Sequence, residues 1–133
     1  MKAVVYRGIN DLGLEEVPEP VIESPTDALV KVTTSAICAS DIHIAELGFH
    51  QPGMVIGHEY CGEIVDTGSE VHHFRKGDRV VGQPFSHCGH CFYCRHQQPE
   101  LCENVVMRGV MGGPGVQAEY ARVPYADNSV RKI

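Results

Sequence analysis

The sequence lacks any long apolar run. Its N-terminal stretch, MKAVVYRGINDLGLEE, has only three consecutive apolar residues before Tyr6. A secretory signal peptide needs a run of about 7–15 apolar residues at this place, and a membrane-spanning helix needs about 20. We therefore predict no signal peptide, no membrane partner and a cytoplasmic location. Cytoplasmic thiols stay reduced, so the six cysteines indicate metal binding or catalysis before disulfides.

Basic residues are few and scattered. The 133 residues include 11 Lys and Arg against 17 Asp and Glu, a formal net charge of −6, and no basic cluster stands out. A nucleic-acid-binding domain carries a basic patch as its electrostatic footprint. The sequence therefore predicts no nucleic-acid partner.

Internal repeats, low-complexity linkers and a glycine-rich dinucleotide-binding loop are also missing. The stretch MGGPG has the wrong spacing for such a loop, and no strand and helix flank it. The length suits one domain with a modest core. We predict a single domain over residues 1–133, without a nucleotide-binding domain.

The sequence does contain short apolar segments separated by glycine and proline. The alternating, β-branched stretch DALVKVTTSAI is typical of a strand. Further strands are indicated by KAVVYRG, VQAEYARVP and the final DNSVRKI. Many short strands between turns predict a mainly β fold, a barrel or a sandwich.

Two segments favour short helices. CASDIHIAELG predicts a helix that Ser40 or Asp41 caps and that Gly48 ends. FYCRHQQPE predicts one or two helical turns.

Four cysteines follow the spacing C-x2-C-x2-C-x7-C, at Cys88, Cys91, Cys94 and Cys102. Four thiolates satisfy tetrahedral zinc and leave no open coordination position, which is the chemistry of a structural site. The bacterial iron–sulfur run has its fourth cysteine three residues on and then proline. Here the interval is seven residues and Glu103 follows, which disfavours a cluster and leaves it open.

A metal-free loop is the other alternative, but four free thiols together would be prone to oxidation. The nearby His87, His90 and His96 could replace a sulfur ligand. Since four cysteines already fill the shell, we predict that these histidines are exposed loop residues.

A second, less conspicuous constellation lies in CASDIH and GHE. Cys38 ends a predicted strand, and His58 lies on a turn between Gly57 and Glu59. One thiolate and one imidazole make half of a zinc site, Glu59 adds a carboxylate, and Asp41 could accept the other ring N–H of His58. Taken singly, a cysteine is more often a small core residue and a histidine is more often simply hydrogen-bonded.

The order of these motifs resembles that of the zinc-dependent medium-chain alcohol dehydrogenases. The resemblance covers nearly the whole chain, through KAVVYRG, ICASDIHI, VIGHEYCGEIVDTGSEV, FRKGDRVV, CGHCFYCRHQQPELCEN and VQAEYARVP. It implies the family's N-terminal catalytic domain, a GroES-like, partly open β-barrel with short helices and a zinc-binding lobe. It also implies an oxidoreductase that interconverts a small alcohol or polyol and its carbonyl by hydride transfer with NAD or NADP, and a homo-oligomer at full length.

The resemblance carries over to individual residues. Cys38 and His58 match the catalytic zinc ligands, and Glu59 matches the carboxylate beside that zinc. Asp41 matches the aspartate that orients the histidine, Ser40 the hydroxyl that takes the alcohol proton, and His43 the surface end of the proton relay. The cysteine quartet matches the lobe that holds the structural zinc.

Two family features are missing from the sequence: the third protein ligand of the catalytic zinc and the nucleotide-binding domain. Asp127 is a conceivable third ligand, but it lies among predicted barrel strands. We therefore expect an isolated catalytic domain that holds the structural zinc firmly, holds the catalytic zinc weakly or not at all, and has no turnover alone. The alternatives are a non-catalytic zinc-binding GroES-like module and a co-chaperonin-like barrel, neither of which needs the CASDIH and GHE pair.

The remaining candidates have ordinary interpretations. We predict that Cys61 is a small core residue and that His72 and His73 are exposed. His50 lies in a stretch that approaches the substrate site in the resembling family, but a solvated histidine is the favoured prediction.

Overall fold

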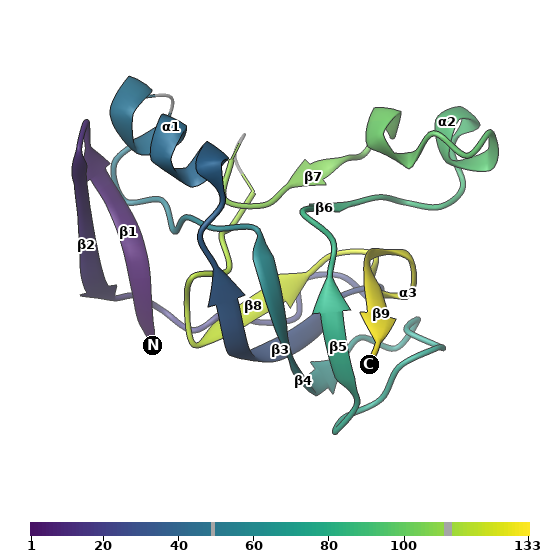
Figure 1. The fold of residues 1–133 in the computed structure, drawn as a ribbon. Coiled ribbons are helices and arrows are strands. Elements are labelled where there is room, and N and C mark those ends of the chain that lie inside the picture. The colour runs from purple at the N-terminus through teal and green to yellow at the C-terminus, as the bar shows by residue number, and fades with distance from the viewer. Residues whose placement is uncertain (49, 111–112) are drawn as a thin grey trace.

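A computed structural model describes residues 1–48, 50–110 and 113–133 of the chain (Figure 1). The strands are β1 (Lys2–Gly8), β2 (Asp11–Glu16), β3 (Ala28–Ala36), β4 (Glu59–Thr67), β5 (Arg79–Gly82), β6 (Phe85–Ser86), β7 (Val106–Met107), β8 (Tyr120–Val123) and β9 (Val130–Lys132). The helices are α1 (Ala39–Leu47), α2 (Phe92–Arg95), α3 (Ala126–Ser129) and the 3-10 turn η1 (Pro99–Leu101). The predicted mainly β fold with short helices is confirmed. None of the helices in the described ranges is long and apolar enough to cross a membrane.

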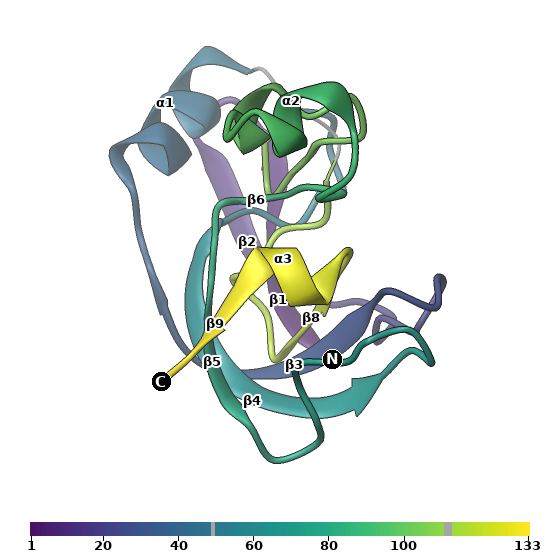
Figure 2. The ribbon, with the colours of Figure 1, turned by 90° about the vertical axis from the view of Figure 1, so that its right-hand side faces the viewer.

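The centre of the molecule is an antiparallel sheet in the order β8-β3-β4-β5-β9. Figure 2 shows β4 and β5 bending around α3 and β8, which gives the sheet the form of a partly open barrel. Alternate residues of these strands face the enclosed side because side chains in a strand alternate between faces. The fully buried members of this core are Ala28, Val30, Ile64, Val80, Val116, Val123, Ala126 and Val130. In Figure 1 the hairpin of β1 and β2 lies to the left of this sheet and the helix α1 lies above its left side. The cysteine lobe, which contains α2 and η1, lies at the upper right.

Helix α1 begins two residues earlier than a cap at Ser40 would place it, and three earlier than a cap at Asp41 would. Cys38 has extended backbone angles and is the N-cap, and the Asp41 carboxylate reaches back to accept the Cys38 backbone N–H at 2.9 Å. The acidic residue therefore caps the helix from its first turn, a position that the helix dipole also favours. The predicted end at Gly48 is confirmed, with φ of 72° in the left-handed region.

The C-terminal segment differs from the single strand predicted for DNSVRKI. Its first half is the helical turn α3, and only Val130–Lys132 form β9 beside β5. Asp127 explains the turn, since its carboxylate accepts the backbone N–H groups of His72 at 2.9 Å and His73 at 3.0 Å. FYCRHQQPE forms two short helical pieces, α2 and η1, as predicted.

Candidate metal centres

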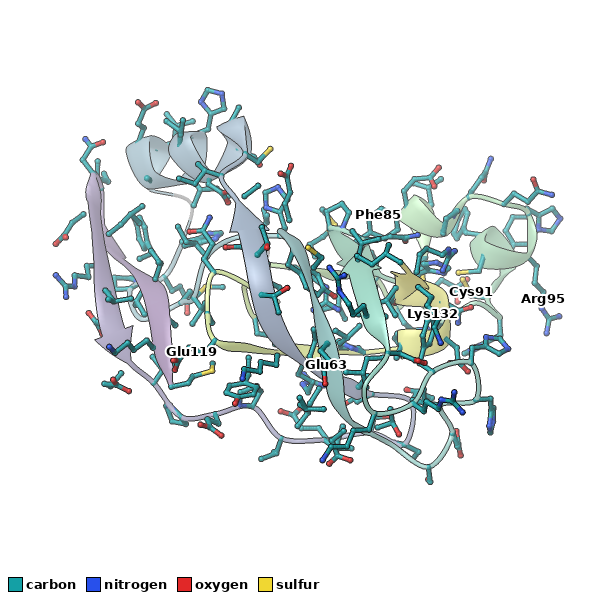
Figure 3. The ribbon with its side chains drawn as sticks, turned by 60° about the horizontal axis from the view of Figure 1, so that its bottom comes forward. Glu63, Phe85, Cys91, Arg95, Glu119 and Lys132 are labelled. Atoms are coloured by element: carbon teal, nitrogen blue, oxygen red, sulfur yellow. The ribbon has the colours of Figure 1, made fainter. Side chains whose placement is uncertain are left out.

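The four cysteines of the quartet meet inside the lobe. Their Sγ atoms all lie within 4.8 Å of one another. The Sγ–Sγ distances are 3.5 Å for Cys88–Cys102, 3.9 Å for Cys91–Cys102 and 4.0 Å for Cys88–Cys94. Tetrahedral zinc with bonds of about 2.3 Å needs sulfurs about 3.8 Å apart. Figure 3 shows Cys91 in the lobe and Arg95 pointing away from it. The spacing of the sulfurs therefore fits zinc.

Backbone amides of the lobe point at the sulfurs. Cys102 Sγ accepts hydrogen bonds from the N–H groups of Cys88 at 3.4 Å and Asn104 at 3.3 Å. Burial raises the pKa of Cys88, but backbone hydrogen bonds from His90 and Cys91 outweigh it and lower this pKa to about 6. Burial and the neighbouring thiols raise the pKa of Cys94 to about 12. Since thiolates are the metal-binding form, a cation in the lobe would have to displace the remaining protons.

The lobe histidines were predicted to be exposed, and this is wrong for His87. His90 and His96 are exposed. His87 is half-buried beside the quartet, with Nδ1 3.7 Å from Cys94 Sγ, and burial lowers its pKa. Its place in the loop directly after β6, which pairs with β7, brings it against the lobe.

The second centre forms where β3 and β4 pair. The ligand atoms of Cys38, His58 and Glu59 lie within 4.8 Å of one another. Glu59, at the start of β4, pairs with Ala36 near the end of β3, so the antiparallel register brings the residues just beyond Ala36 close to those beside Glu59. A sulfur, a nitrogen and an oxygen are three donors, one fewer than tetrahedral zinc takes, which is the donor count of an open zinc site.

The imidazole of His58 lies between two side chains of α1. Its Nε2 is 3.2 Å from Ser40 Oγ, and its Nδ1 is 3.4 Å from Asp41 Oδ1. The latter contact is not aligned as a hydrogen bond, and both atoms are buried without a hydrogen-bond partner in the described part of the chain. When the ring proton is on Nδ1 it faces the carboxylate, and Nε2 carries the single lone pair of the ring. That lone pair can accept the Ser40 hydroxyl proton or bind a cation, and a cation would displace the hydroxyl proton from it.

The structure also locates the remaining candidates. His43 lies exposed on α1. Asp127 is engaged with the His72–His73 backbone and is not among the ligand atoms of either centre in the described ranges. His72 and His73 are exposed, as predicted, whereas Cys61 is half-buried and not a full core residue.

His50 is a further correction, because it is buried and not solvated. Only 8% of the residue is exposed, and its Nε2 lies 2.6 Å from the carbonyl oxygen of Gly109. Its ring also contacts Tyr6 edge-on, with the ring centroids 5.9 Å apart. The sequence around His50 shows no apolar periodicity, and its hydrogen-bond partner lies 59 residues along the chain. Local sequence patterns therefore do not predict that His50 is buried.

A glycine-rich segment supports the turn that carries His58. The amides of Gly115, Val116 and Gln117 donate to the carbonyls of residues 55, 57 and 56, at 3.0–3.1 Å. Gly109 packs directly on Gly57, since a Cβ at Gly109 would lie 2.3 Å from the Gly57 carbonyl oxygen. The glycines in this region were visible in the sequence as turn signals, but not their contact.

Replacing Gly109 by alanine is therefore expected to lower the free energy of unfolding by roughly 1–3 kcal/mol. The new Cβ would meet backbone atoms that cannot move aside, and φ of +54° adds strain. Denaturant unfolding measures the loss. Gly77→Ala is the matched control, since Gly77 has φ of +92° but open space around its Cβ position. Equal losses in the two variants would contradict the predicted clash.

The chain was compared with known protein families and known proteins. The family description "alcohol dehydrogenase GroES-like domain" matches residues 24–132. The chain belongs to this family. It is 43% identical over 148 aligned positions to the uncharacterized zinc-type alcohol dehydrogenase-like protein AdhB of Bacillus subtilis strain 168, covering 100% of this chain and 39% of that protein.

Solved structures of the family agree with the fold. Alcohol dehydrogenase TADH from Thermus sp. ATN1 superposes with a TM-score of 0.96 at 38% identity, over 100% of this chain and 40% of that one. The alcohol dehydrogenase rspB of Escherichia coli CFT073, complexed with NADH, gives 0.80 at 37% identity, over 100% and 38%. The GroES-like fold expected from the motifs is therefore confirmed. The chain spans about 40% of the length of these relatives.

Proposed function

We propose that this chain is the catalytic domain of a zinc-dependent oxidoreductase that interconverts an alcohol or polyol and its carbonyl with NAD or NADP. The observation that carries the proposal is the second centre, where Cys38, His58 and Glu59 converge beside Asp41 and Ser40. Family membership and the NADH-bound relative support it. We also propose that the protein is cytoplasmic, that its thiols are reduced and that the full-length protein forms a homo-oligomer.

Cys38, His58 and Glu59 would hold the catalytic zinc, and the quartet would hold the structural one. When bound, the zinc supplies Lewis acidity toward the substrate oxygen, and the nicotinamide accepts or gives the hydride. Asp41 orients His58 by facing its Nδ1. Ser40, whose hydroxyl is beside the ligand nitrogen of His58, is placed to take the alcohol proton, and the exposed His43 on the same helix is placed to release it to solvent.

A non-catalytic zinc module is the second candidate, and the second centre argues against it. A purely structural protein has no need of an open sulfur–nitrogen–oxygen set whose histidine is flanked by a buried carboxylate and a hydroxyl. The quartet by itself is compatible with either function, because a closed four-sulfur site binds no substrate.

The test is nicotinamide-linked turnover by the zinc-loaded polypeptide as its gene encodes it. We expect absorbance at 340 nm to rise with NAD or NADP and at least one small alcohol, polyol or amino alcohol, and to fall with NADH or NADPH and the matching carbonyl. Ser40→Ala is expected to slow turnover by about 10²-fold or more because it removes a proton acceptor. No turnover in either direction over a panel of such substrates would contradict the proposal.

A further inference from the structure

Gln117 joins the two parts of the second centre. Its Cγ packs on the α-carbon of Gly57, where an added Cβ would lie 2.4 Å away, and its backbone N–H donates to the Ile56 carbonyl at 3.0 Å. Its side-chain Nε2 donates to Asp41 Oδ2 at 3.4 Å and to the Ala36 carbonyl at 3.5 Å. One side chain therefore spans from the turn that carries His58 to helix α1 and the end of β3.

The Asp41 carboxylate needs the donors that surround it. The residue is only 3% exposed, and no Lys or Arg in the described part of the chain forms an ion pair with it. A buried carboxylate oxygen without a cationic partner depends on N–H donors to replace the hydrogen bonds it lost from water. Oδ2 receives the Cys38 N–H at 2.9 Å and the Gln117 amide, while Oδ1 has no hydrogen-bond partner and faces His58 Nδ1.

We propose that Gln117 is a positioning residue of the second metal centre. Its amide helps to hold the Asp41 carboxylate in the rotation in which Oδ1 faces His58 Nδ1, which leaves His58 Nε2 to bind the cation. This inference rests on the proposed function, since it assumes that Cys38 and His58 hold a metal.

A purely structural role would act differently. Gln117 also lines a hollow of about 500 Å³ beside α1, together with Asp41, Ile42 and Ile56. If the side chain only filled space there, its loss would lower stability without changing the affinity of one metal centre. The two roles can therefore be separated by measuring metal affinity and stability in the same variant.

The experiment compares Gln117→Met with the parent polypeptide as its gene encodes it, both stripped of metal and titrated with Co²⁺ against a competing chelator. Methionine keeps an unbranched chain on Gly57 and replaces the carboxamide, with its N–H donor, by a thioether that cannot donate. We expect Co²⁺ affinity at the second centre to fall about tenfold or more, as is typical when a partner of a ligating histidine is lost. The visible absorption band of Co²⁺ at the second centre should shift. The Co²⁺ band of the quartet and the melting temperature should stay near those of the parent.

Two further variants complete the design. Gln117→Glu keeps the shape but places a second carboxylate beside Asp41, and it is expected to weaken the same centre. Gln51→Met is the matched control, because Gln51 is exposed and forms no side-chain hydrogen bond in the described ranges; it should match the parent.

Wild-type affinity and spectrum in both Gln117 variants would overturn the inference. So would an equal loss of both metals together with a lowered melting temperature, which is the signature of a structural role. If the parent binds no Co²⁺ that His58→Ala removes, the proposed metal centre itself is wrong, and the inference falls with it.

Discussion

His58→Ala is expected to abolish nicotinamide-linked turnover, with a loss of roughly 10³-fold or more, because several kcal/mol of Lewis-acid stabilisation disappear with the metal. His58 supplies the nitrogen donor of the second centre, and a methyl group cannot replace it. The vacated space would also leave the buried Asp41 carboxylate without the ring nitrogen that it faces. Steady-state rates of the zinc-loaded, gene-encoded polypeptide measure the loss.

The control is His72→Ala, since His72 is exposed and uses only its backbone to contact Asp127. It should leave the rate within about twofold, the scale expected of a neutral surface change. Metal analysis distinguishes a lost centre from a lost fold, because His58→Ala should still retain the zinc of the quartet. A rate within tenfold of the parent would show that His58 holds no catalytic metal.

Cys102→Ser is expected to empty the quartet and unfold the lobe. The lobe has little core besides its own sulfurs: Cys88, Cys91 and Cys102 are its buried residues, while Phe92 and Leu101 are 62% and 54% exposed. Apolar burial therefore cannot replace the metal. Because metal binding to such a site is folding free energy, we expect one zinc fewer per chain and a stability loss of more than about 4 kcal/mol.

Zinc content, guanidinium unfolding and amide exchange over residues 86–107 test this second result. Cys61→Ser is the matched control, because Cys61 is half-buried and lies in neither ligand group of the described residues. If Cys102→Ser retains as much zinc as Cys61→Ser, the four-sulfur assignment is wrong. Iron and sulfide in the parent polypeptide would instead establish the cluster that the spacing disfavoured.

Local patterns were read correctly from the sequence where the interacting groups are near neighbours. The quartet lies within fifteen residues, so its spacing alone brings the sulfurs together. The strand of residues 28–36 is likewise predicted by the alternation of apolar and polar residues along it. The end of α1 is predicted at Gly48 because glycine readily adopts the left-handed backbone conformation found there. The predicted start of α1 is wrong, because Asp41 is not the N-cap residue itself. Its carboxylate accepts the Cys38 N–H from inside the first turn of the helix.

The second centre is different, because spacing cannot show that Cys38 and His58 meet. Family resemblance suggested the pair, and the register of β3 against β4 brings it together in the structure.

By itself the sequence determined the mainly β class, the four-sulfur lobe and the identity of the residues able to bind metal. Only the tertiary structure decided which distant groups touch: Gln117 against Asp41, His50 against Gly109, and Asp127 against the His72–His73 backbone. The physical reason is that a spacing motif describes the reach of a short chain segment, whereas strand register and buried hydrogen bonds depend on the packing of segments far apart in the sequence.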